Sequence, residues 1–217
     1  MPQTRNPAAA DAAELHLKHG SDRRARRTLK DAWRLNPHPD LAAAFAKLAP
    51  DEDVGQRRKR FKELLDVQPE HTEARLLTGE LALADHDFDG AKIAIGDLVE
   101  SEPSTRSLSI MAAIEKGKGA DDGVIRGWLA KAIAAPRGPQ WICSNCGAVH
   151  ADWVPTCNSC SAFDTLDWTA WKEPEDAIAK KLDMAPLLTD PSDDVEITVP
   201  VEEDPDIEAG GEVKPKD

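Results

Sequence analysis

Residues 141–168 read WICSNCGAVHADWVPTCNSCSAFDTLDW, and this stretch holds all four cysteines of the 217-residue chain: Cys143, Cys146, Cys157 and Cys160. The cysteines form two Cys-x-x-Cys pairs with ten residues between the pairs. Two thiolates three residues apart can wrap a tight turn around one ion, and two such turns facing each other complete a tetrahedron. Gly147, directly after the first pair, supplies the backbone freedom that such a turn needs. The spacing therefore predicts a four-thiolate metal site.

Other uses of four cysteines fit this pattern less well. Two disulfides are the main alternative, but a Cys-x-x-Cys disulfide closes a strained loop, and the first residues do not read as a signal peptide. A thioredoxin-type redox motif needs one such pair at the start of a helix in a βαβ unit. Zinc is favoured over iron because zinc usually occupies structural four-thiolate sites, although a rubredoxin-like iron centre uses the same ligands. Four ligands leave no position for a catalytic water, so we expect a structural site.

The segments around the cysteines predict a small rubredoxin-like zinc ribbon of short β-hairpins over residues 139–171. We expect short strands at Trp141-Ile142, Trp153-Val154 and 166–168, with the tryptophans shielding the metal-binding turns. His150 is an alternative ligand, but with four thiolates available we expect an exposed loop residue. A unit this small has too little core to fold alone, so the metal contributes on the order of 10 kcal/mol to its stability.

A regular repeat of proline runs through residues 6–138, which are rich in alanine and spaced leucines. Pro37, Pro69, Pro103 and Pro136 are 32, 34 and 33 residues apart, a period typical of 34-residue tetratricopeptide (TPR) helix pairs. Small residues let paired helices approach closely, and a proline ends the second helix of each pair. We therefore predict an all-α, TPR-like helical solenoid of about four repeats. An ordinary helical bundle with accidental periodicity is the alternative.

The third repeat matches the TPR pattern best. Counting back from Pro103 in steps of twelve gives Ala91 and Gly79, and the stripes Ala74-Leu77-Leu81 and Ala91-Ile95-Leu98 would face the partner helix. The first repeat places Ala13 and Ala25 at the small positions. The second and fourth repeats are degenerate, with these residues at the same positions: Phe45, Arg57, Ala112 and Val124.

The negative charge of the chain belongs to its carboxy-terminal part. The formal net charge is −13, and residues 173–217 hold 15 acidic and 4 basic side chains, against 25 and 23 in the rest. Such a composition does not offset its ordering entropy, so we expect residues 172–217 to be a largely disordered acidic tail. A short helix over Glu173–Met184 is one exception, and the alternating Val195–Val199 segment is a candidate partner-binding motif.

No stretch of the chain has the roughly 18 apolar residues that a membrane span needs. Reduced cysteines indicate a reducing compartment, so we expect a cytoplasmic protein. Two basic runs, at 23–27 and 57–60, lie on predicted second helices; they indicate a solvated face or a surface for an acidic partner or an anionic membrane. The helical region is not basic overall, so we expect no nucleic-acid partner.

The sequence carries no recognisable motif for catalysis. The sequence has no phosphate-binding loop, dinucleotide fingerprint, nucleophile elbow or histidine–carboxylate cluster, so we predict no catalytic residues and no enzyme. Asp85–Gly90 matches the first half of a calcium loop, but Gly96 stands where that loop needs glutamate. Surface positions are expected for the remaining histidines: His16, His19, His38, His71 and His86.

Helical repeats followed by Trp141-Ile-Cys-Ser-Asn-Cys-Gly, Trp153-Val-Pro-Thr-Cys-Asn-Ser-Cys and Leu166-Asp-Trp resemble the carboxy-terminal half of HemY-family membrane proteins of alphaproteobacteria. The resemblance covers most of residues 10–172. It implies a non-catalytic scaffold for enzymes of late haem (protoporphyrin) biosynthesis at the cytoplasmic face of the inner membrane. Family members carry two amino-terminal transmembrane helices, and we expect that anchor to be absent from this chain.

A second resemblance is to LapB-type lipopolysaccharide assembly proteins, in which tetratricopeptide repeats precede a rubredoxin-like unit with two Cys-x-x-Cys pairs. It implies a metal unit docked on the repeats and regulation of a partner enzyme. Both resemblances predict an interaction protein, and here we expect the ribbon to fold against the last helix pair. The rival hypothesis is a rubredoxin-like iron protein that exchanges electrons.

Overall fold

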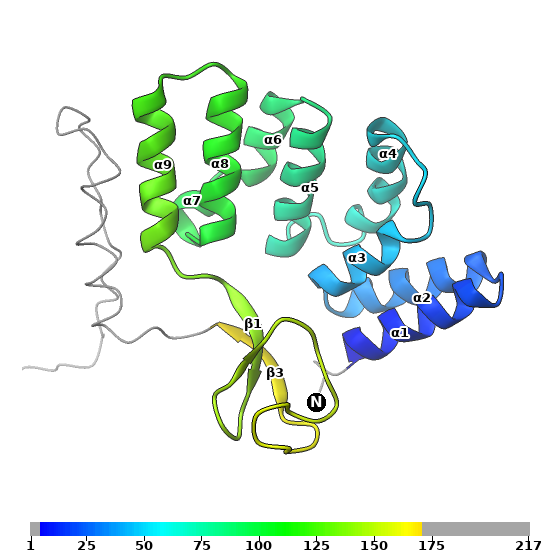
Figure 1. The fold of residues 1–217 in the computed structure, drawn as a ribbon. Coiled ribbons are helices and arrows are strands. Elements are labelled where there is room, and N and C mark those ends of the chain that lie inside the picture. The colour runs from blue at the N-terminus through cyan, green and yellow to red at the C-terminus, as the bar shows by residue number, and fades with distance from the viewer. Residues whose placement is uncertain (1–4, 171–217) are drawn as a thin grey trace, which may run out of the picture.

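The structure is a computed structural model that describes residues 5–170, and it is mostly helical with one small antiparallel sheet (Figure 1). This confirms the predicted helical class and the small β unit. The predictions for residues 172–217, including the helix at Glu173–Met184 and the Val195–Val199 motif, lie outside the described residues. The helices are α1 Arg5–Lys18, α2 Asp22–Leu35, α3 Pro39–Ala46, α4 Val54–Leu65, α5 Thr72–Ala84, α6 Phe88–Ile95, α7 Leu98–Ser101, α8 Thr105–Gly117 and α9 Asp122–Ala134. The strands are β1 Pro139–Cys143, β2 Val149–His150 and β3 Leu166–Ala170.

Each of the four recurring prolines follows a helix end. Pro37 comes two residues after the last residue of α2, Pro103 two after α7, and Pro136 two after α9, whereas Pro69 lies four after α4. Proline lacks the backbone N–H that a continuing helix needs, so each one separates a helix from the next. The helices are arranged one after another along an arc (Figure 1).

The predicted close contact between small residues is confirmed in the pair formed by α5 and α6. A Cβ added at Gly79 would lie 2.9 Å from Cδ1 of Ile95 and 3.7 Å from the carbonyl oxygen of Ala91. The corresponding alanines of the first pair, Ala13 and Ala25, are fully buried. Small side chains at these positions therefore allow the paired backbones to approach.

The predicted stripe Ala91-Ile95-Leu98 is buried, but it does not lie on one continuous helix. α6 ends at Ile95, Gly96 has a φ of +47°, and α7 begins at Leu98. Arg75 from α5 covers the break, since its guanidinium donates to the carbonyls of Ala94 and Ile95 and pairs with Asp97. The positive φ, which glycine adopts at little cost, redirects the chain between the two helices.

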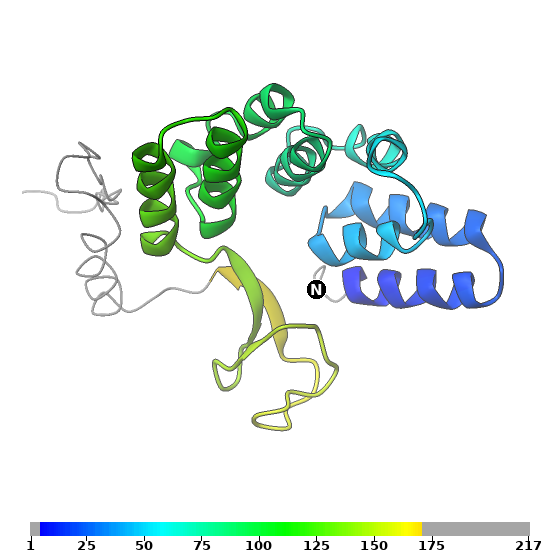
Figure 2. The ribbon, with the colours of Figure 1, turned by 45° about the horizontal axis from the view of Figure 1, so that its top comes forward.

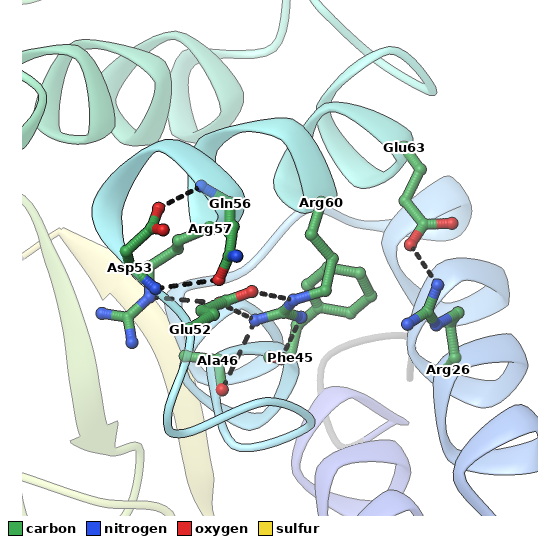
Figure 3. A network of polar contacts seen from close by, with 9 residues as sticks. All are labelled: Arg26, Phe45, Ala46, Glu52, Asp53, Gln56, Arg57, Arg60 and Glu63. Atoms are coloured by element: carbon green, nitrogen blue, oxygen red, sulfur yellow. Dashed lines mark hydrogen bonds and ion pairs between the residues drawn. The ribbon is translucent and has the colours of Figure 1, made fainter.

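Side-chain contacts hold together the two helices of the degenerate second repeat, α3 and α4 (Figure 3). Phe45 of α3 and Phe61 of α4 stack edge to face, with ring centroids 5.1 Å apart. The Arg60 guanidinium lies over both rings, donates to the Phe45 carbonyl 2.7 Å away, and pairs with Glu52. Phe45 thus occupies one of the positions that other repeats give to a small residue, and it is accommodated by stacking on Phe61 under Arg60.

Ion pairs occupy most of the second basic run. Arg57 and Arg60 both pair with Glu52, and Arg58 pairs with Asp85 and Asp87 at the turn between α5 and α6. That turn is the segment that resembles half a calcium loop, and its carboxylates serve Arg58 and the α6 amino terminus instead. In the first run, Arg23, Arg24 and Arg27 are exposed.

The ribbon contains a three-stranded sheet in the order β2-β1-β3, antiparallel throughout. Trp141 faces Trp168 across β1 and β3. The strands predicted at Trp141-Ile142 and 166–168 are present, but the strand predicted at Trp153-Val154 is wrong. Pro155 follows it, and proline restricts the preceding residue and cannot donate to a strand ladder.

The ribbon lies on the inner side of the arc of helices (Figures 1 and 2). The chain leaves α9 with the Pro136 carbonyl bonded to the N–H of Thr105 and then turns at Gly138, whose φ is +84°. This turn points the ribbon across the arc toward α3. The expectation that the ribbon folds against the last helix pair did not include this contact with α3, which is made through His38 and Asp40.

Within residues 5–170, none of the helices has the length and apolar character required to span a bilayer.

Candidate metal centre

The four cysteine sulfurs come together at one point. All four Sγ atoms lie within 4.8 Å of one another, and the pairs Cys143–Cys160 and Cys146–Cys157 are each 3.7 Å apart. Four sulfurs placed about 2.3 Å from a central ion at tetrahedral corners would be about 3.8 Å apart. The cluster is therefore compatible with a single tetrahedrally coordinated metal ion, and its geometry does not identify that ion.

Two equivalent turns build the cluster. In the first, the N–H of Gly147 donates to the carbonyl of Cys143, and the N–H of Cys143 donates to the carbonyl of Ala148. In the second, the N–H of Ser161 donates to the carbonyl of Cys157, whose own N–H donates to Ala162. The fifth residue of each turn has a positive φ, +72° at Gly147 and +59° at Ser161. The backbone freedom expected at Gly147 is confirmed, and the second turn reaches the same shape with a serine.

Polar side chains around the cluster contact three of the sulfurs. The Thr165 hydroxyl lies 3.2 Å from Sγ of Cys143, and the Asn145 amide donates to Sγ of Cys160 at 3.4 Å. Nε2 of His150 lies 3.3 Å from Sγ of Cys157. The prediction of an exposed loop residue at His150 is wrong, because β2 holds this half-buried side chain against the cluster.

The electrostatics of the cluster require a cation if all four cysteines are to ionise. Hydrogen bonds from the Thr165 hydroxyl and from backbone N–H groups of the turn lower the pKa of Cys143 to about 6. The Asn145 amide lowers the pKa of Cys160. The N–H of Ala148 acts in the same direction at Cys146, but burial and the neighbouring thiols outweigh it and raise the pKa of Cys146 to about 11. Like charges resist joint ionisation, and a divalent ion between the sulfurs removes that resistance.

The cluster is continuous with the apolar core of the ribbon. Cys143, Cys157, Trp141 and Leu166 are almost fully buried, and Trp153 and Trp168 pack against them. A metal ion at this position would join the two turns to the sheet, since Cys143 is the last residue of β1 and pairs with Leu166 of β3. The arrangement suits a structural metal.

The same face of the sheet, two residues along both strands from Cys143 and Leu166, contacts the helices through a histidine. His38, 1% exposed, packs against the rings of Trp141 and Trp168, with centroid distances of 5.2 and 4.3 Å, and the two tryptophan rings lie 5.2 Å from each other. Its Nδ1 accepts from the N–H of Asp40 and so caps the amino terminus of α3. Nε1 of Trp141 donates to the Asp40 carboxylate at 3.3 Å. The surface position expected for His38 is wrong.

Burial changes the titration of both polar residues at this contact. Desolvation lowers the pKa of His38 to about 4 and raises the pKa of Asp40. Nε2 of His38 is buried and has no hydrogen-bond partner within residues 5–170. A neutral imidazole therefore joins the ribbon to α3.

The spacing of the four cysteines predicted the cluster, but the contacts that other residues make with the cluster and with its sheet were not predicted. The signal for His38 was present in His38-Pro39-Asp40, because proline favours the first helical position and a preceding polar residue favours the cap. Thr165, Asn145 and His150 carry no comparable signal, since their role depends on how the two turns face each other.

Comparison with known proteins gives one distant similarity. No family model matches the chain, and no solved structure matches it. The chain is 29% identical over 179 residues to a protein of Magnetospirillum gryphiswaldense strain MSR-1 described as "Probable magnetosome protein Mms48". The match takes in 81% of this chain and 39% of the relative, so the chain spans well under half of the relative's length.

Proposed function

We propose that the protein is a non-catalytic adaptor, in which a TPR-like helical array holds a protein partner and a zinc-bound ribbon completes the binding surface. The observation that carries this proposal is the contact of Trp141 and Trp168 with His38. It joins two units distant in sequence on the inner side of the arc, and repeat arrays commonly bind partners on that side.

Three features support a TPR-like array. The prolines recur every 32 to 34 residues, each follows a helix end, and Gly79 lies against Ala91 and Ile95 where the repeat pattern expects small residues. Zinc is the proposed metal because it is the usual ion of four-thiolate structural sites. Its role is to hold the two cysteine turns together; iron is the alternative ion, with a rubredoxin-like redox role.

The HemY resemblance places the proposed partners among enzymes of late haem biosynthesis, at the cytoplasmic face of the inner membrane. Two other settings have specific support. The contact of the ribbon with the helices favours a LapB-like regulator of lipopolysaccharide assembly, and the similarity to a magnetosome protein favours a role in magnetosomes.

A pull-down from membranes of the source organism, read by mass spectrometry, tests the proposal. The intact chain is compared with a Cys157→Ser, Cys160→Ser variant and with Ser159→Ala, an exposed neighbour of the cysteines that serves as the matched control. We expect the intact chain and the control to recover the same partner, and the double variant to lose it. Metal analysis of the same samples should give one zinc per chain.

The identity of the recovered protein separates the settings. Haem-pathway enzymes support the scaffold assignment, whereas lipopolysaccharide enzymes or magnetosome proteins support the corresponding alternatives. Bound iron in the purified chain would favour the redox role. Recovery that is the same with all three chains would contradict a binding surface that includes the ribbon.

A further inference from the structure

The last helix of the array carries an apolar stripe on its outer face. Ile125, Leu129 and Ile133 follow one another at four-residue spacing along α9. Leu129 and Ile133 are each 44% exposed, and Ile125 is partly exposed. Apolar residues at this spacing normally face a packing partner. Within residues 5–170 the stripe is left partly uncovered.

In the first two repeats, the equivalent positions, counted back from the proline of each repeat, contact the helix pair that follows. Ile125 stands eleven residues before Pro136, as Arg26 does before Pro37 and Arg58 before Pro69. Arg26 pairs with Glu63 of α4, and Arg58 pairs with Asp85 and Asp87 beside α6.

Leu129 shows the same relation, because it stands seven residues before its proline, as Lys30 does in α2. Lys30 also pairs with Glu63. These positions therefore form the contact between one helix pair and the next. In α9 they are apolar instead of basic, which indicates that the next element to pack there is apolar.

The chain leaves the ribbon close to this face. Ala170, the last described residue, pairs with Pro139, which follows α9 by only five residues. From Ala170 to Glu173 an extended chain spans about 10 Å. Ile133 also lines an open groove beside this point, together with Thr105 and Ser109 of α8 and Gln140 of β1. The residues after the ribbon are therefore tethered within reach of the stripe.

The sequence after the ribbon matches the stripe in pattern and in charge. Residues 173–188 read EPEDAIAKKLDMAPLL, with Ile178 and Leu182 four residues apart and Pro174 near the start. Twelve residues of helix span about 18 Å, close to the length of the 13-residue α9. The first four residues include three carboxylates, and Arg137 is exposed at the base of α9.

We propose that residues 173–184 form an amphipathic helix, ending before Pro186, that packs on the Ile125–Leu129–Ile133 stripe of α9 and covers the last helix of the array. Repeat arrays need a terminal element with a polar outer face, because the last pair otherwise exposes apolar surface. On this proposal, the tail helix and not the ribbon packs against the last helix pair.

Hydrogen exchange of the full chain, followed by mass spectrometry, tests this packing. We expect the amides of residues 177–184 to exchange at least about tenfold more slowly than those of an unstructured chain, as in a packed helix. Two double variants should abolish the protection: Leu129→Asp with Ile133→Asp, and Ile178→Asp with Leu182→Asp. Ile93→Asp on α6, where the side chain is 81% exposed, and Val195→Asp further along the tail should leave the protection unchanged.

Three results would overturn the proposal. Unprotected amides at 177–184 in the wild-type chain would show that the segment does not pack. Protection that survives the α9 double variant would place the segment elsewhere. A dimer in solution that dissociates with the α9 double variant would make a second copy the partner of the stripe. Unchanged exchange in α5 serves as the check that each variant is folded.

Discussion

Gly79 and His38 show how single residues set the distances in this molecule. Gly79 allows α5 and α6 to approach until Ile95 nearly touches its backbone. His38 packs against two tryptophans of the ribbon, which also contact each other, and caps α3 with the same ring. One residue acts by lacking a side chain, and the other by a buried neutral ring.

A large side chain at Gly79 should separate α5 from α6. Gly79→Leu is expected to lower the free energy of unfolding by about 1–3 kcal/mol, the usual cost of overpacking. Urea denaturation followed by circular dichroism measures the change. Gly55→Ala on α4 is the control, because a Cβ there meets only the Asp53 carboxylate at 3.5 Å, and we expect no loss of stability. Equal destabilisation by both variants would contradict the close contact.

The buried imidazole predicts a pH dependence of stability. The pKa of His38 is about 4 in the folded chain and 6.5 ordinarily. Between these values the unfolded state binds more protons, so the contribution of His38 is fully present above pH 6.5 and is lost as the pH falls toward 4. The loss at pH 5 should be about 2 kcal/mol. The raised pKa of Asp40 acts in the opposite direction and reduces the net effect.

The variant His38→Asn keeps a capping side chain but does not titrate. Its stability should therefore depend less on pH between 4 and 6.5 than that of the wild type, measured by thermal melting at several pH values. Metal release at low pH affects both proteins alike. Identical pH profiles would show that His38 is not buried in the neutral form.

The elements of the ribbon are two equivalent turns joined to a sheet. Ser161 has a left-handed backbone where the first turn has Gly147, and such a conformation costs most residues about 1–2 kcal/mol. Ser161→Gly should therefore stabilise the ribbon by up to about 1 kcal/mol, and Gly147→Val should destabilise it by more than that. Resistance to a zinc chelator measures both. A loss of stability in Ser161→Gly, or no loss in Gly147→Val, would show that the turns are not equivalent.

Local patterns in the sequence were sufficient for some elements. Cysteine spacing predicted the cluster, and the recurring prolines marked the helix ends, because both patterns act over a few residues. Contacts between distant segments were not predictable in this way. The turn at Gly138 sends the ribbon to α3, about a hundred residues away in sequence, and only that contact buries His38. The break at Gly96 was missed because the apolar stripe continues through it.

At the scale of the whole molecule, the arc of helices and the ribbon inside it form one surface. The ribbon is connected to α9 by the chain and to α3 by the His38 contact, so it spans the inner side of the arc (Figure 2). A partner held there would meet helices and ribbon together. In the proposed adaptor, the metal would therefore act by holding the ribbon in this surface, for which it needs no open coordination position.

Two truncations distinguish the contribution of residues 173–188 to stability from that of residues 189–217. Removal of residues 189–217 should leave the melting temperature unchanged, because this acidic segment has too little apolar surface to pack. Removal of residues 173–217 should lower it, since the proposed cover of α9 is lost as well. Differential scanning fluorimetry of the two truncated chains and the full chain measures both. A melting temperature that drops by many degrees on removal of residues 189–217 alone would show that this acidic segment is packed.

We expect one zinc ion to hold the ribbon together, beside a helical array that folds without it. Native mass spectrometry of the full chain counts the bound metal, with Cys143→Ser as the variant and Ser159→Ala as the control. We predict one zinc per chain in the wild type and the control, and no metal in Cys143→Ser, whose helical circular dichroism signal stays largely intact. Iron in the wild type, two disulfides in place of a metal, or loss of all helical signal in the variant would contradict this prediction.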